Sequence, residues 1–213
     1  MPLYKTKYIS RRKSSNSQIL IWKVTETYAE LLERVVLNLS SSIRLDGMKS
    51  EMHQRAFLSV RILLQDAGYT DLDLYYDDNG KPHLHGDKHI SITHSHNFAA
   101  IIISDEIVGI DMEMRRDKII RIAHKFCDSE FQFLNQDDQE YIQKLTVIWG
   151  AKEAIFKIRN EKGISFKNHI KVLPFELQNE KVTAELHYDT VVKDFTIHFE
   201  EIEAFSLVYA FEK

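Results

Sequence analysis

The sequence is poor in the residues that build disulfide frameworks, flexible linkers and membrane spans. It has a single cysteine among 213 residues, which excludes an internal disulfide framework and favours a reducing, cytoplasmic environment. With 7 glycines and 3 prolines, long flexible linkers are not expected. No apolar run approaches the ~18 residues of a membrane-spanning helix, and residues 1–9 lack the apolar core of a signal peptide. We therefore expect a cytoplasmic protein that does not act at a membrane.

An excess of positive charge is also absent. The 28 lysines and arginines are outnumbered by 32 aspartates and glutamates, so no overall basic field attracts nucleic acid. Hydrophobic residues make up 44% and charged residues 28%, which is the balance of a soluble globular protein. The length suffices for one large domain or two smaller halves.

A strand with alternating carboxylates is the first chemical signal. The β-branched residues of Val108-Gly109-Ile110 favour a strand over residues 107–113. Side chains alternate along a strand, so Asp111 and Glu113 share one face. Two carboxylates that close repel each other unless a cation lies between them, and magnesium prefers such oxygen ligands. A solvated polar face on an edge strand is the alternative interpretation.

A long helix over residues 138–159 offers a third carboxylate. Ile148, Ala151 and Ile155 recur at helical spacing and form an apolar stripe, which Ile158 extends. Trp149, Glu153 and Lys157 lie four residues apart on a neighbouring stripe. The alternative interpretation is an ordinary Glu–Lys pair on a surface helix.

Histidines gather before the carboxylate strand. Thr93-His94-Ser95 ends a short strand that includes Ile90 and Ile92, where an imidazole flanked by hydroxyls could bind a phosphate. A partly buried structural histidine is the alternative. Two His-x-His pairs, at residues 83–85 and 94–96, could suggest zinc or iron, but no third ligand has matching spacing.

These segments together resemble a known family. With Gly80-Lys81-Pro82 upstream, they are similar to the 4'-phosphopantetheinyl transferases of the surfactin-synthetase-activating type. That family has a Gly-Lys-Pro turn, a Ser/Thr-His-Ser strand end, a Val-Gly-Ile-Asp-x-Glu strand and a Trp-x-x-Lys-Glu-Ala-x-x-Lys helix, in this order. The resemblance covers residues 47–175. Relatives usually have Ser or Thr after the tryptophan, where this chain has Gly150.

The resemblance implies a holo-[acyl-carrier-protein] synthase. Such an enzyme moves the phosphopantetheine arm of coenzyme A to a serine of an acyl or peptidyl carrier protein, requires Mg²⁺ and releases adenosine 3',5'-bisphosphate. It implies Asp111, Glu113 and Glu153 as metal ligands, with Glu153 and Lys157 as the catalytic residues. We expect Asp111 to be exposed. The implied coenzyme A contacts are Arg55, Lys81, Thr93, His94, Asp111, Lys152 and Lys157, with Lys49 and His53 near enough to share the work of Arg55.

The resemblance also implies an α+β fold made of two similar α+β halves. These are residues 1–106 and 107–213, which form a pseudo-dimer with a cleft between them, and the second half carries the metal site. Such a chain is expected to be a monomer. The patterns predict strands at 3–9, 18–24, 72–76, 90–92, 98–104, 107–113, 170–173, 182–188, 195–200 and 205–211. They predict helices at 25–39, 49–66, 118–126, 129–134 and 138–159, and a tight hairpin at Asp105-Glu106.

Two other functions remain open at this point. A magnesium-dependent phosphohydrolase could use the same carboxylates, and a coenzyme A-binding protein could lack catalysis altogether. A carrier protein, if one is the partner, is expected to dock on a local basic surface, because carriers of this kind are acidic around the modified serine. The densest such cluster comprises Arg115, Arg116, Lys118, Arg121 and Lys125.

Overall fold

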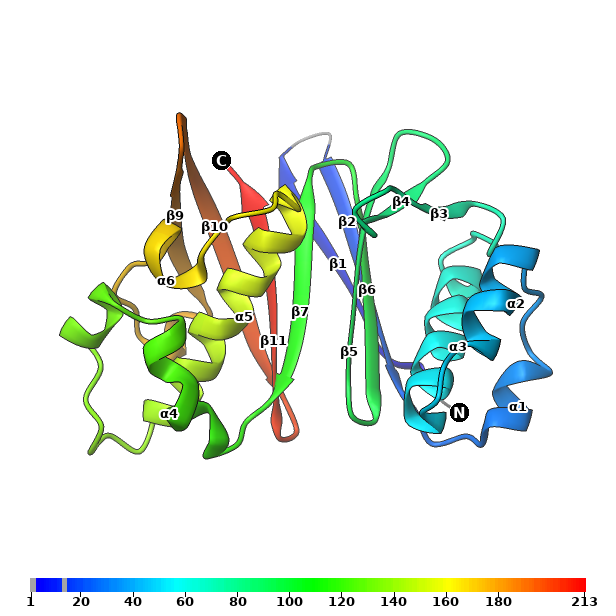
Figure 1. Cartoon of the computed structure of the whole chain (residues 1–213), viewed down its shortest axis with the longest axis horizontal. Coiled ribbons are helices and arrows are strands. Elements are labelled where there is room, and N and C mark those ends of the chain that lie inside the picture. Colours follow the sequence, from blue (N-terminus) through cyan, green and yellow to red (C-terminus); the bar gives the residue numbers. More distant parts are fainter. Residues whose placement is uncertain (1–2, 13–14) are drawn as a thin grey trace. The chain divides into compact units, whose positions relative to one another are not determined.

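The computed structural model describes residues 3–12 and 15–213. It divides into two compact units, the first up to Glu106 and the second from Ile107 (Figure 1). Each unit contains an antiparallel sheet and helices, so the fold is α+β. The pseudo-dimer with a cleft between its halves stays a prediction. No helix in the described ranges is both long and apolar enough to cross a membrane.

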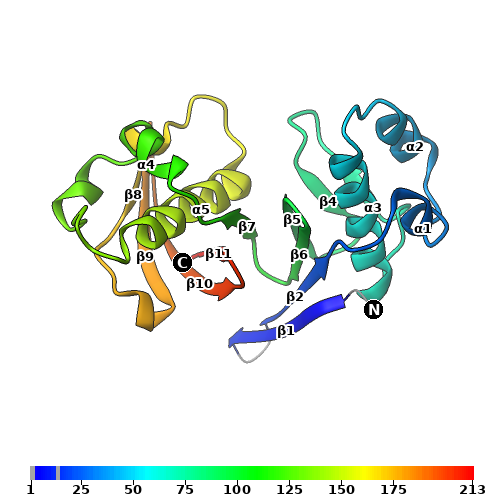
Figure 2. The same ribbon diagram turned by 90° about the horizontal axis from the view of Figure 1, so that it is seen from below.

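The first unit is built on a four-stranded antiparallel sheet. Its strands run in the order β1 (Leu3–Arg12), β2 (Ser15–Lys23), β6 (Phe98–Ser104) and β5 (His89–Ser95). All seven residues of β6 are buried, and helix α3 (Glu51–Asp66) packs against β6 and β2 (Figure 2). The short strands β3 (Leu74–Tyr76) and β4 (Pro82–Leu84) pair across the turn predicted at Gly80, whose φ is 80°.

The helix predicted for residues 25–39 is wrong. The chain forms two helices there, α1 (Tyr28–Leu32) and α2 (Leu39–Asp46). Asn38 separates them, because its side-chain oxygen accepts a hydrogen bond from Ser41 N at 2.8 Å and so begins a new helix. A non-local contact fixes this break, since Asn38 N donates to Asp71 Oδ2 at 2.8 Å.

A buried ion pair holds the loop after α3 against α2. Arg61 Nε donates to Asp71 Oδ1 at 3.0 Å, and both side chains are 2% exposed. The same guanidinium donates to Ser41 Oγ at 3.2 Å. Arg61 is therefore a structural residue and is not available to a ligand.

The hairpin predicted at Asp105-Glu106 is also wrong. Strand β6 pairs with β2 and β5, whereas β7 (Val108–Met114) pairs with β11 (Phe205–Glu212) in a different sheet. The two acidic residues bind partners within the first unit. Asp105 forms an ion pair with Lys88, and Glu106 accepts a hydrogen bond from Ser15 Oγ at 2.5 Å. The segment is the boundary between the units.

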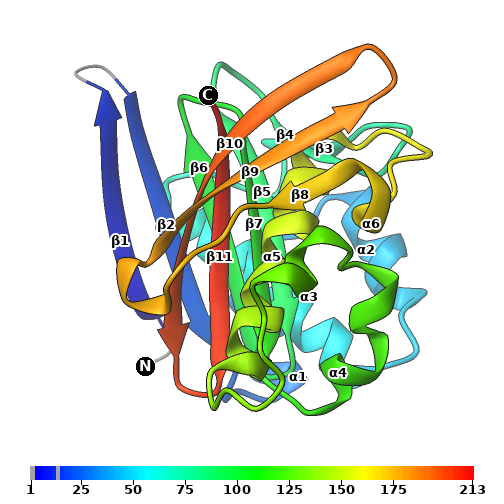
Figure 3. The same cartoon turned by 90° about the vertical axis from the view of Figure 1, so that its left-hand side faces the viewer.

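The second unit has a five-stranded antiparallel sheet. Its order is β7, β11, β10 (Val191–Ile202), β9 (Lys181–Tyr188) and β8 (Ile170–Val172). Helix α5 (Tyr141–Arg159) lies along β7 and β11 (Figure 3), and its predicted apolar stripe is buried in the core. The other helical segments are α4 (Lys118–Ile122), α6 (Phe166–His169) and three 3₁₀ turns, Ala123–Lys125, Ser129–Gln132 and Leu177–Asn179. The helices predicted at 118–126 and 129–134 are therefore shorter than expected.

Two glycines let α5 approach the sheet closely. A Cβ atom added to Gly109 of β7 would lie 2.0 Å from the carbonyl oxygen of Ala154, so only glycine fits beneath the helix. A Cβ atom on Gly150 of α5 would lie 2.7 Å from Cγ2 of Val208 on β11. The glycine that replaces the usual Ser or Thr is therefore explained by close packing, and α5 continues through it.

We expect Gly109→Ala to lower the free energy of unfolding of the second unit by about 3 kcal/mol, near the upper end for overpacking, because a backbone carbonyl cannot rotate away. Urea unfolding followed by far-ultraviolet circular dichroism measures this. Gly47→Ala is the control. Gly47 has a φ of −74° and its added Cβ would be 3.6 Å from the nearest atoms, so we expect a gain of about 0.4–1 kcal/mol. An unchanged midpoint for Gly109→Ala would contradict the close contact.

Candidate active site

Asp111 and Lys157 form the centre of the candidate site. Lys157 Nζ on α5 donates to Asp111 Oδ1 at 2.9 Å and to the carbonyl oxygen of Ile110 at 2.8 Å. The Asp111 side chain is 7% exposed. The expectation of an exposed carboxylate is therefore wrong, because α5 packs over β7 and brings the lysine onto it. The site is thus preassembled within the second unit.

The two glutamates belong to the same electrostatic cluster. Burial, and then the charge of Asp111, raise the pKa of Glu153 to about 7, although Lys157 acts in the opposite direction. Burial and Asp111 likewise raise the pKa of Glu113. Since Asp111 contributes to the raised pKa of both glutamates, and Glu113 contributes to that of Glu153, strand β7 and helix α5 bring the three predicted ligands close together.

The donor set of this cluster fits a divalent cation. Three carboxylates face one ammonium, which leaves an excess of two negative charges when all are ionised. Carboxylate oxygens are the ligands that Mg²⁺ prefers. In the described part of the chain, no three or more His, Cys, Asp or Glu side chains already form a metal-binding group. Magnesium binding therefore stays a prediction.

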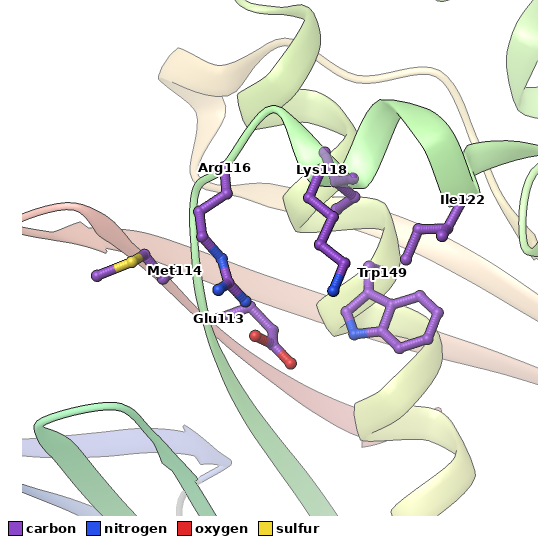
Figure 4. Close-up of a pocket in the computed structure, with 7 residues that line it drawn as sticks. Glu113, Met114, Arg116, Lys118, Ile122 and Trp149 are labelled. Atoms are coloured by element: carbon purple, nitrogen blue, oxygen red, sulfur yellow. The ribbon is translucent and has the colours of Figure 1, made fainter.

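A cavity of about 180 Å³ lies beside Glu113. Trp149 hydrogen-bonds to Glu113 and orients its carboxyl group. This hydrogen bond partly offsets the rise in the pKa of Glu113 that burial and Asp111 cause. Figure 4 shows Glu113, Lys118 and Trp149 pointing toward the same space. The other lining residues are Met114, Arg116, Ile119 and Ile122. Basic groups of α4 and the loop before it thus lie next to the carboxylates. The sequence spacing places Trp149 on the same side of α5 as Glu153, but it does not predict the hydrogen bond of Trp149 to Glu113.

Lys152 lies in the core, away from the carboxylates. Its side chain is 0% exposed and forms a 2.6 Å ion pair with buried Glu130. Its ammonium also donates to the carbonyl oxygens of Phe126 at 2.6 Å and Phe166 at 3.0 Å. All three N–H donors are used inside the protein, so the expected contact of Lys152 with coenzyme A is not supported by its position. Nothing in the sequence pattern pairs it with Glu130.

Besides Arg55, three of the predicted coenzyme A residues lie in the first unit. Lys81 is half-buried after the Gly80 turn, and its backbone N–H donates to Asp77 Oδ1 at 2.9 Å. Thr93 is buried in β5, whereas His94 beside it is exposed. Nothing tests their binding role, which stays a prediction.

Arg55 and His53 differ in the side of α3 that they occupy. The positive charge of Arg55 contributes to lowering the pKa of Glu30, so its guanidinium lies near α1. The imidazole of His53 lies beside that of His94, with 5.9 Å between ring centroids. The structure therefore brings the imidazole of His53 beside that of His94.

The first His-x-His pair is arranged for stacking. His83 and His85 stack on Tyr75, with centroid distances of 5.3 and 4.8 Å. His83 Nε2 also lies 3.1 Å from Asp77 Oδ2. Both imidazoles thus pack against one tyrosine ring, and they belong to no group of three or more His, Cys, Asp or Glu side chains arranged to hold a metal in the described ranges.

Four of the five residues of the predicted basic surface are exposed, and the fifth, Arg115, is paired with an acidic residue. Arg115 forms a 2.8 Å ion pair with Glu201 and donates to the carbonyl oxygen of Glu203. The other four members, Arg116, Lys118, Arg121 and Lys125, are exposed. The continuous helix predicted for residues 118–126 is wrong, because α4 ends at Ile122 and Lys125 lies in a 3₁₀ turn.

Comparison with known proteins agrees with the sequence resemblance. Residues 107–208 match the family model described as the 4'-phosphopantetheinyl transferase superfamily. The match spans the second unit, including the Asp111, Glu113, Glu153 and Lys157 cluster. No curated protein matches the chain.

The raised pKa of Glu153 predicts a pH-dependent stability. Its pKa is about 7 in the folded protein and about 4.3 in an unfolded chain. The folded state keeps this proton longer, so stability falls as pH rises between these values. Without divalent cations, Glu153→Gln should therefore raise the free energy of unfolding by roughly 1–2 kcal/mol at pH 8 and by less at pH 5.

Urea unfolding at both pH values measures this difference. Asp137→Asn removes one charge at an exposed position and serves as the control, for which we expect no pH-dependent gain. If Glu153→Gln is less stable than the wild type at pH 8, the ionised Glu153 side chain does not destabilise the folded protein, and the raised pKa is contradicted.

Proposed function

Because the chain belongs to the 4'-phosphopantetheinyl transferase superfamily, we propose that it transfers the 4'-phosphopantetheine arm of coenzyme A to a serine of an acyl or peptidyl carrier protein. The observation that carries the proposal is the cluster of three coupled carboxylates and Lys157 inside the matched residues. Phosphopantetheine transfer as a reaction class follows from the superfamily. The acceptor, the metal and the released nucleotide are proposed.

The reaction is a displacement at phosphorus. The serine oxygen bonds to the phosphorus next to pantetheine, and the bond from that phosphorus to the bridging oxygen breaks. Adenosine 3',5'-bisphosphate leaves with the bonding electrons, and the serine proton passes to a base. Such reactions depend on positioning and on groups that stabilise the developing negative charge.

Asp111, Glu113 and Glu153 are the residues that would hold the metal ion. Mg²⁺, when bound, would bind pyrophosphate oxygens and stabilise the negative charge that builds there. Trp149 supports Glu113 in this role, because its hydrogen bond orients the carboxylate.

Glu153 and Lys157 act on the reacting groups. The pKa of Glu153 is about 7 without a cation, and a cation bound to this carboxylate would lower it, so the role as base rests on the place of Glu153 beside Asp111 and Lys157. We therefore assign Glu153 as the base for the serine hydroxyl, directly or through a water molecule. Before a substrate binds, Lys157 donates to Asp111 and to the Ile110 carbonyl, which orients its ammonium for a pyrophosphate oxygen.

Residues of the first unit are proposed to bind the nucleotide end of coenzyme A. Lys81 and His94 offer donors for phosphate oxygens, and Thr93 offers a hydroxyl. Arg55 on α3 stays a predicted contact as well, and its Nε is buried. Lys152 is left out, because its ammonium is buried.

One experiment separates the proposal from the two alternatives. The protein is incubated with coenzyme A, Mg²⁺ and a purified apo acyl carrier protein, and the carrier is weighed by mass spectrometry. Transfer adds one phosphopantetheine to the carrier. Hydrolysis of coenzyme A without carrier modification would favour the phosphohydrolase, and binding without either reaction would favour a non-catalytic protein.

We expect Asp111→Asn to reduce kcat/KM for transfer by at least about 100-fold, as one lost charge interaction at the reacting phosphates can cost about 3 kcal/mol. Asparagine keeps the size of this buried side chain, so the fold is preserved better than with alanine. The same mass assay measures the rate, and Asp137→Asn is the exposed control. Near wild-type rates for Asp111→Asn at saturating Mg²⁺ would remove Asp111 from the metal site.

The exposed basic residues near α4 are proposed to dock the carrier. Arg116 and Lys118 line the cavity beside Glu113, so an acidic partner bound there would present its serine near the carboxylates. Because exposed charges act mainly on encounter, Arg121→Glu with Lys125→Glu should raise the KM for the carrier about tenfold and leave the KM for coenzyme A unchanged.

A second double variant matches the change in charge. Lys171→Glu with Lys181→Glu alters exposed lysines of β8 and β9, and we expect the KM for the carrier to stay the same. Steady-state kinetics over a range of salt concentrations measures both variants. Equal losses for carrier and coenzyme A in the α4 variant would exclude specific docking.

A further inference from the structure

A buried ion pair on α5 has no part in the proposed chemistry. The side chains of Lys152 and Glu130 are 0% and 1% exposed, and Nζ lies 2.6 Å from Oε1. Glu130 also accepts hydrogen bonds from the backbone N–H groups of Val172 and Asp128, both at 3.0 Å. Well-packed apolar side chains of similar size are often as stabilising as a buried ion pair. Stability alone therefore does not explain why charged residues occupy this position.

The ammonium of Lys152 fixes two separate segments onto α5. It donates at 2.6 Å to the carbonyl oxygen of Phe126, which directly follows the 3₁₀ turn Ala123–Lys125. It also donates at 3.0 Å to the carbonyl oxygen of Phe166, the first residue of α6. An apolar side chain could donate neither bond, so the charge serves these two backbone contacts.

The rings of the same two phenylalanines contact Trp149, which lies one helical turn before Lys152 on α5. The Phe126 ring meets the indole edge to face, with centroids 5.1 Å apart and an angle of 75° between the planes. The Phe166 ring lies 5.5 Å from the indole at 53°. Lys152 thus fixes the backbone of both residues whose rings flank the indole.

Trp149 in turn orients a carboxylate of the candidate site. Its indole N–H is the donor in the hydrogen bond to Glu113, because tryptophan offers no acceptor. Both side chains line the cavity beside the carboxylates (Figure 4). Hydrogen bonds weaken steeply when their geometry is lost, so a shift of the indole would release Glu113.

We infer that Lys152 is a positioning residue, which holds the indole of Trp149 in place through Phe126 and Phe166 and so orients Glu113 for a divalent cation. The part that concerns the cation rests on the proposed function, whereas the position of the indole is a property of the protein alone. Lys152 itself touches no substrate. Replacing groups that orient a metal ligand typically costs about 10–100-fold in metal affinity, so loss of this support should weaken cation binding.

A charge-neutral double variant tests the inference. Lys152→Met with Glu130→Gln removes the ammonium and its counter-charge together, so no unpaired charge is left in the core. Titration calorimetry measures the binding of Mg²⁺ to the protein alone, and we expect an affinity about tenfold below that of the wild type. ¹H–¹⁵N spectra follow the indole N–H of Trp149, which Trp149→Phe identifies among the two tryptophans. We expect this signal to move upfield in the double variant, because the hydrogen bond to Glu113 is lost.

Two further variants separate positioning from stability. Phe126→Leu removes one ring contact and keeps both charges, so it should change the Mg²⁺ affinity and the indole signal in the same direction, and it decides the matter if the double variant does not fold. Val182→Ala shortens a buried side chain of β9 in the same core. It should lower the stability of the fold and leave the Mg²⁺ affinity and the indole signal unchanged.

The outcomes distinguish this inference from the proposed function. An unchanged indole signal and Mg²⁺ affinity in the double variant and in Phe126→Leu would overturn the positioning role alone, as would an equal loss of affinity in Val182→Ala. A wild type that binds no Mg²⁺ would instead remove the metal from the proposed function, and the indole signal would then decide the positioning role. Neither readout requires transfer, so a protein that fails to modify a carrier leaves both measurements valid.

Discussion

The direct contact between strand β7 and helix α5 determines the chemistry of the second unit. Gly109 has no side chain, so the carbonyl of Ala154 can lie where a Cβ atom would otherwise be. This contact brings Asp111, two residues farther along the strand, within hydrogen-bond distance of Lys157 on the helix. The same approach buries the carboxylates and raises the pKa of Glu153 to about 7. A larger residue beneath the helix would separate the charged groups and remove the coupling among them.

Sequence patterns predicted those elements whose residues carry a regular signal. Strand β7 and helix α5 were predictable because β-branched residues and an apolar stripe mark their inward faces. The break between α1 and α2 was not, because it depends on Asp71, which lies far along the chain and accepts a hydrogen bond from Asn38 N. A short acidic link between two apolar strands indicates local pairing, so the sequence favours a hairpin after β6. The pairing of β7 with β11 joins residues far apart in the sequence, so no local pattern predicts it.

The candidate site was predictable where function follows from spacing. Asp111 and Glu113 are two residues apart on a strand and therefore share one face of it. Glu153 and Lys157 are one helical turn apart and share one side of the helix, so the sequence alone predicts both pairs. Burial of Lys152 was not predictable, because it requires Glu130 from a separate 3₁₀ turn. Lys152 and Glu153 are adjacent in α5 but have different partners, Glu130 for the first and the Asp111 cluster for the second, which a resemblance in letters cannot distinguish.

The ion pair between Lys157 and Asp111 has a thermodynamic consequence under the proposed function. Lys157 shares the Asp111 carboxylate with any divalent cation bound there, so its attraction to Asp111 weakens when the cation is present. The ammonium then becomes a better partner for a phosphate oxygen. By linkage, a nucleotide that draws Lys157 away from Asp111 strengthens cation binding by the same factor. One side chain thus makes the two ligands bind cooperatively, with no rearrangement needed elsewhere in the chain.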